Sequence, residues 1–176
     1  MKWPVVQVEE IRAKGRNSLV GGPFGSDLST KHYAEDGVPV IRGCNLPDYS
    51  PFHDDDFVYV SDDKARELAS NTAGAGDLIF TQRGTLGQVG LVPQSPRYPR
   101  YVISQSQMKL TVDESKALPS FVYYFFRLPA TVESIKSHVS SSGVPHINLG
   151  VLRRFKMPLP PLIAQSKISS NLSAYD

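Results

Sequence analysis

The sequence predicts an α+β fold: a mixed, largely antiparallel sheet with hairpin loops and a few helices, followed by the start of a long helix. Short runs of β-branched and aromatic residues recur between glycine and proline clusters, which is typical of strands joined by tight turns. Helical segments are fewer, and two of them begin at a proline in the last third of the chain. With 176 residues, 40% of them hydrophobic, the chain is long enough for one core and too short for two ordinary domains.

Residues 76–92 are predicted to form a β-hairpin around which the rest of the chain is organised. Its two arms have the composition of buried strands, and Gly84 and Gly87 permit the positive φ angles of a tight turn. The tip would present four polar side chains: Thr81, Gln82, Arg83 and Thr85. Arginine pairs with guanine, and glutamine with adenine, through two hydrogen bonds. The tip is therefore a candidate for reading DNA, and an ordinary polar hairpin is the alternative.

The N-terminal part is expected to begin with a strand at residues 3–8 and a helical turn at residues 9–12. Three glycines and a proline within residues 19–26 exclude a regular element and predict a tight crossing of the chain, with Phe24 tucked inward. No lysine follows these glycines at the spacing of a phosphate-binding P-loop, so that role is disfavoured.

The next segment is expected to form one helix and two strands. Ser29 suits an N-cap and Gly37 a left-handed terminator, which favours a helix over residues 30–36. Residues 38–42 and 57–60 have strand composition.

Later helices have clearer signals. Ser61 precedes two acidic residues, which favour a helix N-terminus, and apolar residues follow at helical spacing. Pro119 is expected at the first turn of a second helix, whose aromatic run over residues 121–126 belongs to the core. Pro129 is expected to begin a third helix, which extends through residue 139.

Two further strands are predicted at residues 102–104 and 107–112. The second alternates apolar side chains with Lys109 and Thr111, which is typical of a strand with one exposed face. Residues 140–146 are rich in serine and are expected to form a loop that is mobile or close to a ligand. It ends at His146, whose ordinary role would be that of a surface residue.

The C-terminal segment predicts contact with another helix. An extended, proline-rich stretch over residues 155–162 precedes four residues at intervals of three and four: Gln165, Ile168, Leu172 and Tyr175. This spacing is the beginning of a heptad seam. Because fewer than two heptads are not stable alone, the chain is expected to be part of a longer protein, with a domain at residues 1–158 and the start of a long helix at 159–176.

Charge is segregated along the chain, although the net charge is only +2. Residues 27–77 contain eleven acids and four bases, a net charge of −7, whereas residues 78–112 contain four bases and no acid. A basic face can bind a polyanion even on a nearly neutral protein. The pattern predicts such a face unless folding mixes the segments in space.

Other classes of protein and site are disfavoured. One cysteine, Cys44, excludes an internal disulfide, and no apolar run is long enough for a signal peptide or a membrane helix, which together favour a cytoplasmic protein. Residues 53–56 carry metal-ligand side chains, but consecutive residues rarely converge on one ion, so a solvated loop is favoured. No nucleophile–base pair or catalytic carboxylate pair is evident. The chain is therefore expected to have no catalytic residue, cofactor or metal of its own.

Four motifs occur in a fixed order along the chain. They are Gly-Gly-Pro-Phe-Gly-Ser at 21–26, Gly-Val-Pro-Val-Ile-Arg-Gly-Cys-Asn at 37–45, Gly-Asp-Leu-Ile-Phe-Thr-Gln-Arg-Gly-Thr-Leu-Gly at 76–87 and Met-Pro-Leu-Pro-Pro-Leu-Ile-Ala-Gln at 157–165. Together they resemble the DNA specificity (S) subunits of type I restriction-modification systems. The last motif usually has glutamate where Ala164 stands, a minor departure. The resemblance spans nearly the whole chain.

The resemblance implies one target-recognition domain, the first of two, followed by the start of the family's conserved spacer helix. In that family each domain reads one half of a split DNA target, and the specificity subunit is not catalytic. Methyltransferase subunits bind S-adenosylmethionine and methylate an adenine, and restriction subunits use ATP to translocate and cut DNA. S-adenosylmethionine, ATP and Mg²⁺ are therefore expected only on partner subunits. The expected partners are double-stranded DNA, methyltransferase (modification) subunits, restriction subunits, and a second target-recognition domain or second copy through the spacer helix.

Two sets of DNA-contacting residues are predicted. Loop residues with base-compatible chemistry are Arg42, Asn45, Thr81, Gln82, Arg83, Thr85, Gln105, Ser106 and Gln107. Basic residues better suited to phosphates are Lys14, Arg16, Lys31, Arg97, Arg100 and Lys109. Gln82 and Arg83 are the foremost candidates, and the alternative for Arg83 is a structural ion pair with Asp77. The alternative for the whole chain is a protein-interaction and assembly module without direct DNA readout.

Overall fold

A computed structural model describes residues 2–138 and 145–174 of the chain. The strands are β1 (Val5–Gln7), β2 (Leu19–Gly21), β3 (Tyr33–Ala34), β4 (Val38–Ile41), β5 (Val58–Val60), β6 (Thr72–Ala73), β7 (Leu78–Thr81), β8 (Val89–Leu91), β9 (Tyr101–Ile103), β10 (Gln107–Leu110) and β11 (Lys156–Pro158). The α-helices are α1 (Asp62–Glu67), α2 (Pro119–Arg127), α3 (Pro129–Ser137), α4 (Leu149–Arg154) and α5 (Leu162–Ser173). Short 3₁₀ helices are η1 (Val8–Ile11), η2 (Gly25–Asp27), η3 (Thr30–His32), η4 (Gly43–Asn45) and η5 (Ala69–Asn71).

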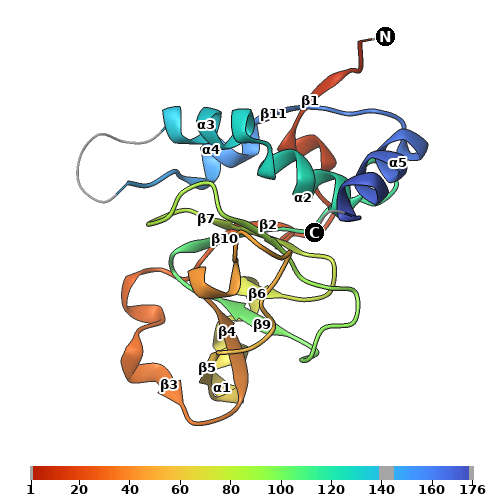
Figure 1. The fold of residues 1–176 in the computed structure, drawn as a ribbon. Helices are drawn as coiled ribbons and strands as arrows, with labels where there is room; N and C mark the ends of the chain where they lie inside the picture. The colour runs from red at the N-terminus through yellow and green to blue at the C-terminus, as the bar shows by residue number, and fades with distance from the viewer. Residues whose placement is uncertain (1, 139–144, 175–176) are drawn as a thin grey trace.

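The elements form three layers (Figure 1). Helices α2–α5 cover one side of a central four-stranded antiparallel sheet of order β2-β10-β7-β8. A second sheet, of order β3-β5-β4-β9-β6, lies on the other side, and its β4–β9 pair is parallel. Strands β1 and β11 pair beside the helices. This arrangement confirms the predicted α+β class with largely antiparallel pairing.

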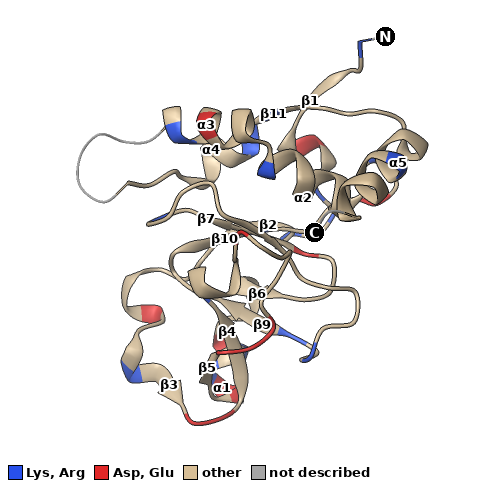
Figure 2. Ribbon diagram, viewed as in Figure 1, with Lys and Arg blue, Asp and Glu red and all other residues tan. Residues whose placement is uncertain are grey.

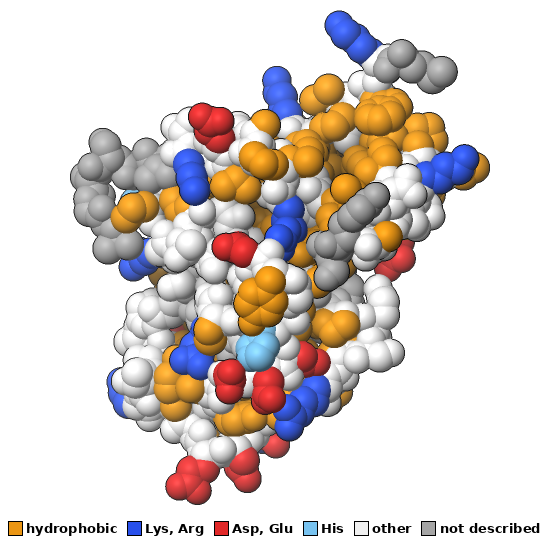
Figure 3. Space-filling view, viewed as in Figure 1, with side chains coloured by type: hydrophobic (Ala, Val, Ile, Leu, Met, Phe, Trp, Pro, Cys, Tyr) orange, Lys and Arg blue, Asp and Glu red, His pale blue; other side chains and the backbone are white. Residues whose placement is uncertain are grey.

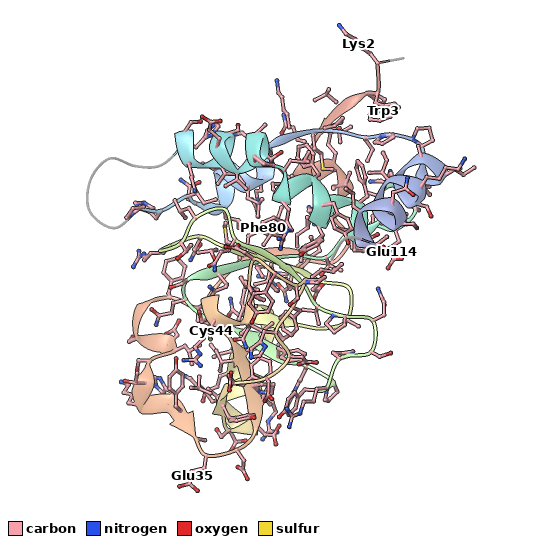
Figure 4. The ribbon with its side chains drawn as sticks, viewed as in Figure 1. Lys2, Trp3, Glu35, Cys44, Phe80 and Glu114 are labelled. Atoms are coloured by element: carbon pink, nitrogen blue, oxygen red, sulfur yellow. The ribbon has the colours of Figure 1, made fainter. Side chains whose placement is uncertain are left out.

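The central sheet is covered on both faces. Phe80 packs against Phe126 of α2 with ring centroids 4.8 Å apart, at the junction of sheet and helices (Figure 4). Its neighbour Ile79 belongs instead to the cluster that contains Ile41 and Ile103 of the second sheet. Adjacent residues of a strand point to opposite faces, so β7 contributes to two cores at once.

The predicted hairpin and several predicted helices are confirmed. Strand β7 pairs with β8 from Leu78↔Leu91 to Phe80↔Val89, and Gly84 and Gly87 have φ of 100° and 93°. Ser61 caps α1, because its Oγ accepts a hydrogen bond of 3.2 Å from the Lys64 backbone. Helices α2 and α3 each begin at the expected proline.

Other expectations are wrong. Residues 30–36 form η3 and β3 rather than one helix, and Gly37, with φ of 126°, makes the turn between β3 and β4. Helix α4 has no predicted counterpart. Residues 107–110 do not alternate between buried and exposed side chains. All four are buried, because the helices cover one face of β10 and the second sheet covers the other.

The C-terminal helix packs on its own domain. Gln165 is fully buried and Ile168 packs against the main core, so this part of the expected seam is not free for another chain. Leu172 is 38% exposed, and Tyr175 lies outside the described residues, as do residues 139–144 of the expected serine-rich loop. The boundary at residue 158 stays a prediction. No helix among the described residues is long and apolar enough to cross a bilayer.

Candidate nucleic-acid interface

A hollow of about 770 Å³ opens where five segments meet, and it is here called the polar hollow because amide and guanidinium side chains are among its lining. It is lined by the loop after β2, η5, the hairpin tip, the β9–β10 turn and the segment that enters α4. Its lining residues are Gly21, Gly22, Pro23, Phe24, Gly25, Asp27, Ser70, Asn71, Gln82, Arg83, Gln105, His146, Ile147, Asn148 and Leu149. Three of the predicted base-contacting residues, Gln82, Arg83 and Gln105, are thus brought together.

Gln82 fixes the floor of the polar hollow. Its backbone N–H donates to the Ser106 carbonyl at 2.8 Å, and its carbonyl accepts from the Ile147 N–H at 2.9 Å. Its Nε2 donates to the Gln105 carbonyl at 2.6 Å. One of the two amide protons of Gln82 is therefore committed, and the two-bond contact to adenine expected from the sequence uses the other proton together with Oε1.

Arg83 lies at the lip of the polar hollow with an exposed side chain. Its backbone forms an isolated antiparallel bridge with His146. Within the described residues its guanidinium makes no hydrogen bond or ion pair. The alternative pairing with Asp77 is wrong, because Asp77 is buried and contacts Lys109 and Thr111 instead. Such a guanidinium can donate two parallel hydrogen bonds to a guanine edge or a phosphate.

Three predicted base-contacting residues are buried and cannot reach DNA. Thr81 is 3% exposed and donates to Gln88 Oε1 at 3.1 Å. Gln107 is 1% exposed and accepts from the Ser104 hydroxyl. Asn45 is fully buried, where its side chain binds the main chain of residues 42, 53 and 55 and closes the loop before β5. Their polarity serves the turns between strands, which is why the sequence alone presents them as loop residues open to a ligand.

Lys109 is not a phosphate ligand. Its register with Ile79 and Val20 places it on the sheet face that packs on the second sheet. There its Nζ lies 3.9 Å from Asp77 Oδ2, and both side chains are less than one-tenth exposed. Burial raises the pKa of Asp77 and lowers the pKa of Lys109, and each charge partly offsets the effect on the other.

The arginines of the β8–β9 loop are neutralised by the acidic segment. Arg97 Nη1 lies 2.9 Å from Asp55, and Arg100 Nη2 lies 2.7 Å from Asp62. Figure 2 shows acidic segments around β3, β5 and α1, at the end of the molecule opposite the helices. The charge segregation of the sequence is therefore partly mixed in space, and Arg97 and Arg100 are weaker phosphate candidates than predicted.

A second concentration of charge is better placed. Arg12, Lys14, Arg16 and Arg153 line a groove of about 510 Å³, here called the basic groove, together with Gly15 and Leu19. Arg12 is held by the Ser18 hydroxyl at 3.0 Å, whereas the side chains of Lys14, Arg16 and Arg153 are exposed. Lys14 and Arg16 are thus accessible to a phosphate, and that contact stays a prediction. Arg153 joins them; the sequence analysis missed it because α4 was not predicted.

The basic groove adjoins the polar hollow. Strand β2 contributes Leu19 to the groove and Gly21 to the hollow. Helix α4 contributes Arg153 to the groove and Leu149 to the hollow. Two residues of strand, or four of helix, span roughly 6–7 Å. The nearest lining residues of the groove and the hollow are therefore about two base-pair steps of B-DNA apart, at 3.4 Å for each step.

The remaining predicted residues lie around these features. Thr85 is exposed on the hairpin, and Ser106 is half-buried with its carbonyl used by Gln82. Gln105 donates its side-chain amide to the carbonyls of Gly25 and Leu28 and thus holds the loop after β2. Arg42 donates to the Asp56 carbonyl at 2.9 Å, and Lys31 is exposed on η3. Hollow-lining residues that the sequence analysis did not select are Asn71, Asn148 and Phe24.

No three ligand-type side chains among the described residues converge on a common metal position. The polar hollow contributes hydrogen-bonding groups of both polarities, an arginine and an exposed aromatic ring. Such a set suits recognition of a polar, planar, anionic ligand.

Residues 30–176 match the family described as the type I restriction modification DNA specificity domain. The chain belongs to this family. It is 24% identical over 177 residues to the putative type I restriction enzyme MjaX specificity subunit of Methanocaldococcus jannaschii, covering 99% of this chain and 39% of the relative. It is 29% identical over 75 residues to the MjaVIII specificity subunit of the same organism, covering 43% and 17%.

Solved structures share the fold of this DNA specificity domain. The HsdS subunit from Thermoanaerobacter tengcongensis has a TM-score of 0.63 at 16% identity, covering 98% of this chain and 36% of that one. The type I restriction-modification S subunit from M. genitalium has a TM-score of 0.66 at 16% identity, covering 100% and 39%. A structure described as showing assembly and conformational transition of the type I system has a TM-score of 0.69 at 17% identity, covering 98% and 38%. The chain spans less than two-fifths of the length of each of these relatives.

Proposed function

We propose that this domain binds double-stranded DNA and reads one half of a bipartite target for a type I restriction-modification enzyme. The polar hollow faces base edges, and the basic groove faces the adjoining phosphate backbone. The observation that carries the proposal is the exposed Arg83 guanidinium, which has no partner within residues 2–138 and 145–174, at the lip of a hollow close to four clustered basic residues. Base contacts specify the sequence and phosphate contacts set the register, so the two features divide the two tasks.

The proposal assigns chemistry to partner subunits. The domain is non-catalytic. Methyltransferase subunits bind S-adenosylmethionine, and restriction subunits bind ATP and Mg²⁺. The assembled enzyme is located in the cytoplasm. A second target-recognition domain or copy of the chain, joined through the helix that starts with α5, reads the other half of the target.

The test is equilibrium binding by the specificity subunit assembled with its methyltransferase subunits, on a matched duplex and on duplexes with single base-pair changes. Arg83→Ala is expected to weaken matched binding by about 1–3 kcal/mol and to relax one base position. Arg16→Ala is expected to weaken binding on every duplex alike and to lower the slope of log K against log salt by about 0.9. Arg66→Ala, on α1 at the far end of the second sheet, is the matched control and should change neither quantity. Retained discrimination in Arg83→Ala would contradict the base-reading role.

A second candidate, an assembly module without DNA readout, is favoured by one observation. Figure 3 shows hydrophobic side chains gathered over α5 and the N-terminal strand. They include Trp3, Val5 and Ile163, which are 42%, 63% and 75% exposed. This patch fits a protein contact in addition to the DNA face. Duplex binding without sequence preference, together with partner association that does not weaken as salt rises, would support assembly as the sole role.

A further inference from the structure

Phe24 is 87% exposed, the highest exposure of any large hydrophobic side chain among the described residues. The sequence predicted the opposite orientation, with Phe24 inward. The structure buries the preceding Pro23 instead, so the ring points away from the core at the edge of the polar hollow.

The loop that carries Phe24 is held from behind. The Gly22 N–H donates to the Gln107 carbonyl at 2.7 Å, and Asn71 Nδ2 donates to the Gly21 carbonyl at 2.8 Å. A side chain at Gly22 would run into the Ser104 carbonyl, so the loop lies directly on the β9–β10 turn. The exposure of Phe24 is therefore a property of an anchored loop, and a ligand would find the ring already positioned.

The surroundings of the ring favour a nucleobase over a protein surface. The same hollow contains Arg83, Asn148 and Asn71. Of the other strongly exposed apolar side chains, Val5 and Ile163 lie on the N-terminal strand and α5, and Tyr49 lies in the loop between η4 and β5. Protein interfaces have a contiguous apolar core. An exposed ring in a hollow that also presents amides, a guanidinium and the partly buried Leu149 matches a ligand with an apolar face and a polar edge, which is the description of a base.

Resting on the proposed function, we propose that Phe24 stacks on a nucleobase of the bound DNA, next to the bases that Arg83 contacts. The stacked base leaves its own neighbours in the duplex, as happens where apolar side chains enter a base step. Gly25, which follows Phe24, has free space where a Cβ would stand, and so leaves room for the sugar–phosphate backbone to approach.

The test uses the assembled complex and a set of matched duplexes, each with one abasic site. Phe24→Ala is expected to weaken binding to the intact duplex roughly 5- to 150-fold, the range for loss of one base–aromatic stack. At one position the abasic duplex should bind wild type and Phe24→Ala equally, since base and ring form one coupled pair. Phe24→Trp, which keeps a stacking face, should remain within a few-fold of wild type. Thermal unfolding of Phe24→Ala should be unchanged because the ring is exposed.

The outcomes separate the two proposals. Wild-type binding with no preference for the matched duplex would overturn the proposed function and the stacking role together. Wild-type discrimination with an unchanged Phe24→Ala, or with a Phe24→Ala loss of equal size on every abasic duplex, would overturn only the stacking role. Failure of Phe24→Ala to assemble with the methyltransferase subunits would assign the ring to a protein contact and would likewise overturn it.

Discussion

Gln165 is expected to fix the start of α5 on the domain. Its Oε1 accepts from the Leu118 N–H at 2.8 Å, and its Nε2 donates to the carbonyls of Lys116 and Pro160 at 3.1 and 2.7 Å. Gln165→Leu keeps the volume but leaves these three backbone groups unpaired at a fully buried site. Each unpaired group destabilises by about 1–3 kcal/mol when it is shielded from water, and two of the three are only partly shielded. The expected loss of unfolding free energy is therefore about 2–4 kcal/mol.

The assay is urea unfolding followed by far-ultraviolet circular dichroism. At an m-value of about 2 kcal/mol per molar urea, the midpoint should fall by about 1–2 M. Ser166→Ala, at the next and exposed position of the same helix, is the control and should stay within about 0.5 kcal/mol of wild type. A Gln165→Leu loss no larger than that of the control would refute the view that these bonds anchor the helix.

Three further substitutions test two buried polar side chains and one closely packed glycine. Lys109→Met leaves the Asp77 carboxylate without its partner and should lower stability at pH 7 by about 3–5 kcal/mol. Because the pKa of Asp77 is raised in the folded state, the folded protein binds the proton first, so stability should recover as pH falls from 7 toward 5; a flat profile would contradict this. Gly22→Ala places a methyl group against the Ser104 carbonyl and should lower stability by about 1–3 kcal/mol, measured by urea unfolding; an unchanged midpoint would show that the loop shifts freely. Asn45→Ala removes three hydrogen bonds to the main chain and should reduce the thermal midpoint without changing base preference; a changed preference would return Asn45 to the DNA-contacting set.

Local signals predicted the elements whose residues determine their own conformation. Gly84 and Gly87 mark the hairpin because only their backbones take its positive φ angles readily. Pro119 and Pro129 mark helix starts for an equally local reason. Lys109 misled the prediction for β10 because alternation indicates an exposed face only when one side of a sheet meets water. Here a second sheet covers that side, and Asp77, far away in sequence, makes a buried lysine tolerable.

The sequence predicts the side-chain chemistry of the candidate site better than it predicts where each residue lies. Arg83 was selected because its turn and its side chain both pointed to a ligand, and the structure leaves it exposed. Gln107 and Asn45 have equally suitable side chains, but both are buried, and groups three to ten positions away in the sequence occupy their hydrogen-bonding atoms. The glycine and proline run at residues 19–26 predicts a tight crossing with Phe24 inward, whereas the structure buries Pro23 and leaves the ring exposed on an anchored loop.

The most direct measurement is a methylation map of genomic DNA modified by the assembled enzyme, with wild-type chain and with Arg83→Ala. The wild-type map should give a bipartite target, and Arg83→Ala should make one base position degenerate within one half while the other half is unchanged. An identical target in both maps, with the variant folded and assembled, would contradict the assignment of base reading to the polar hollow.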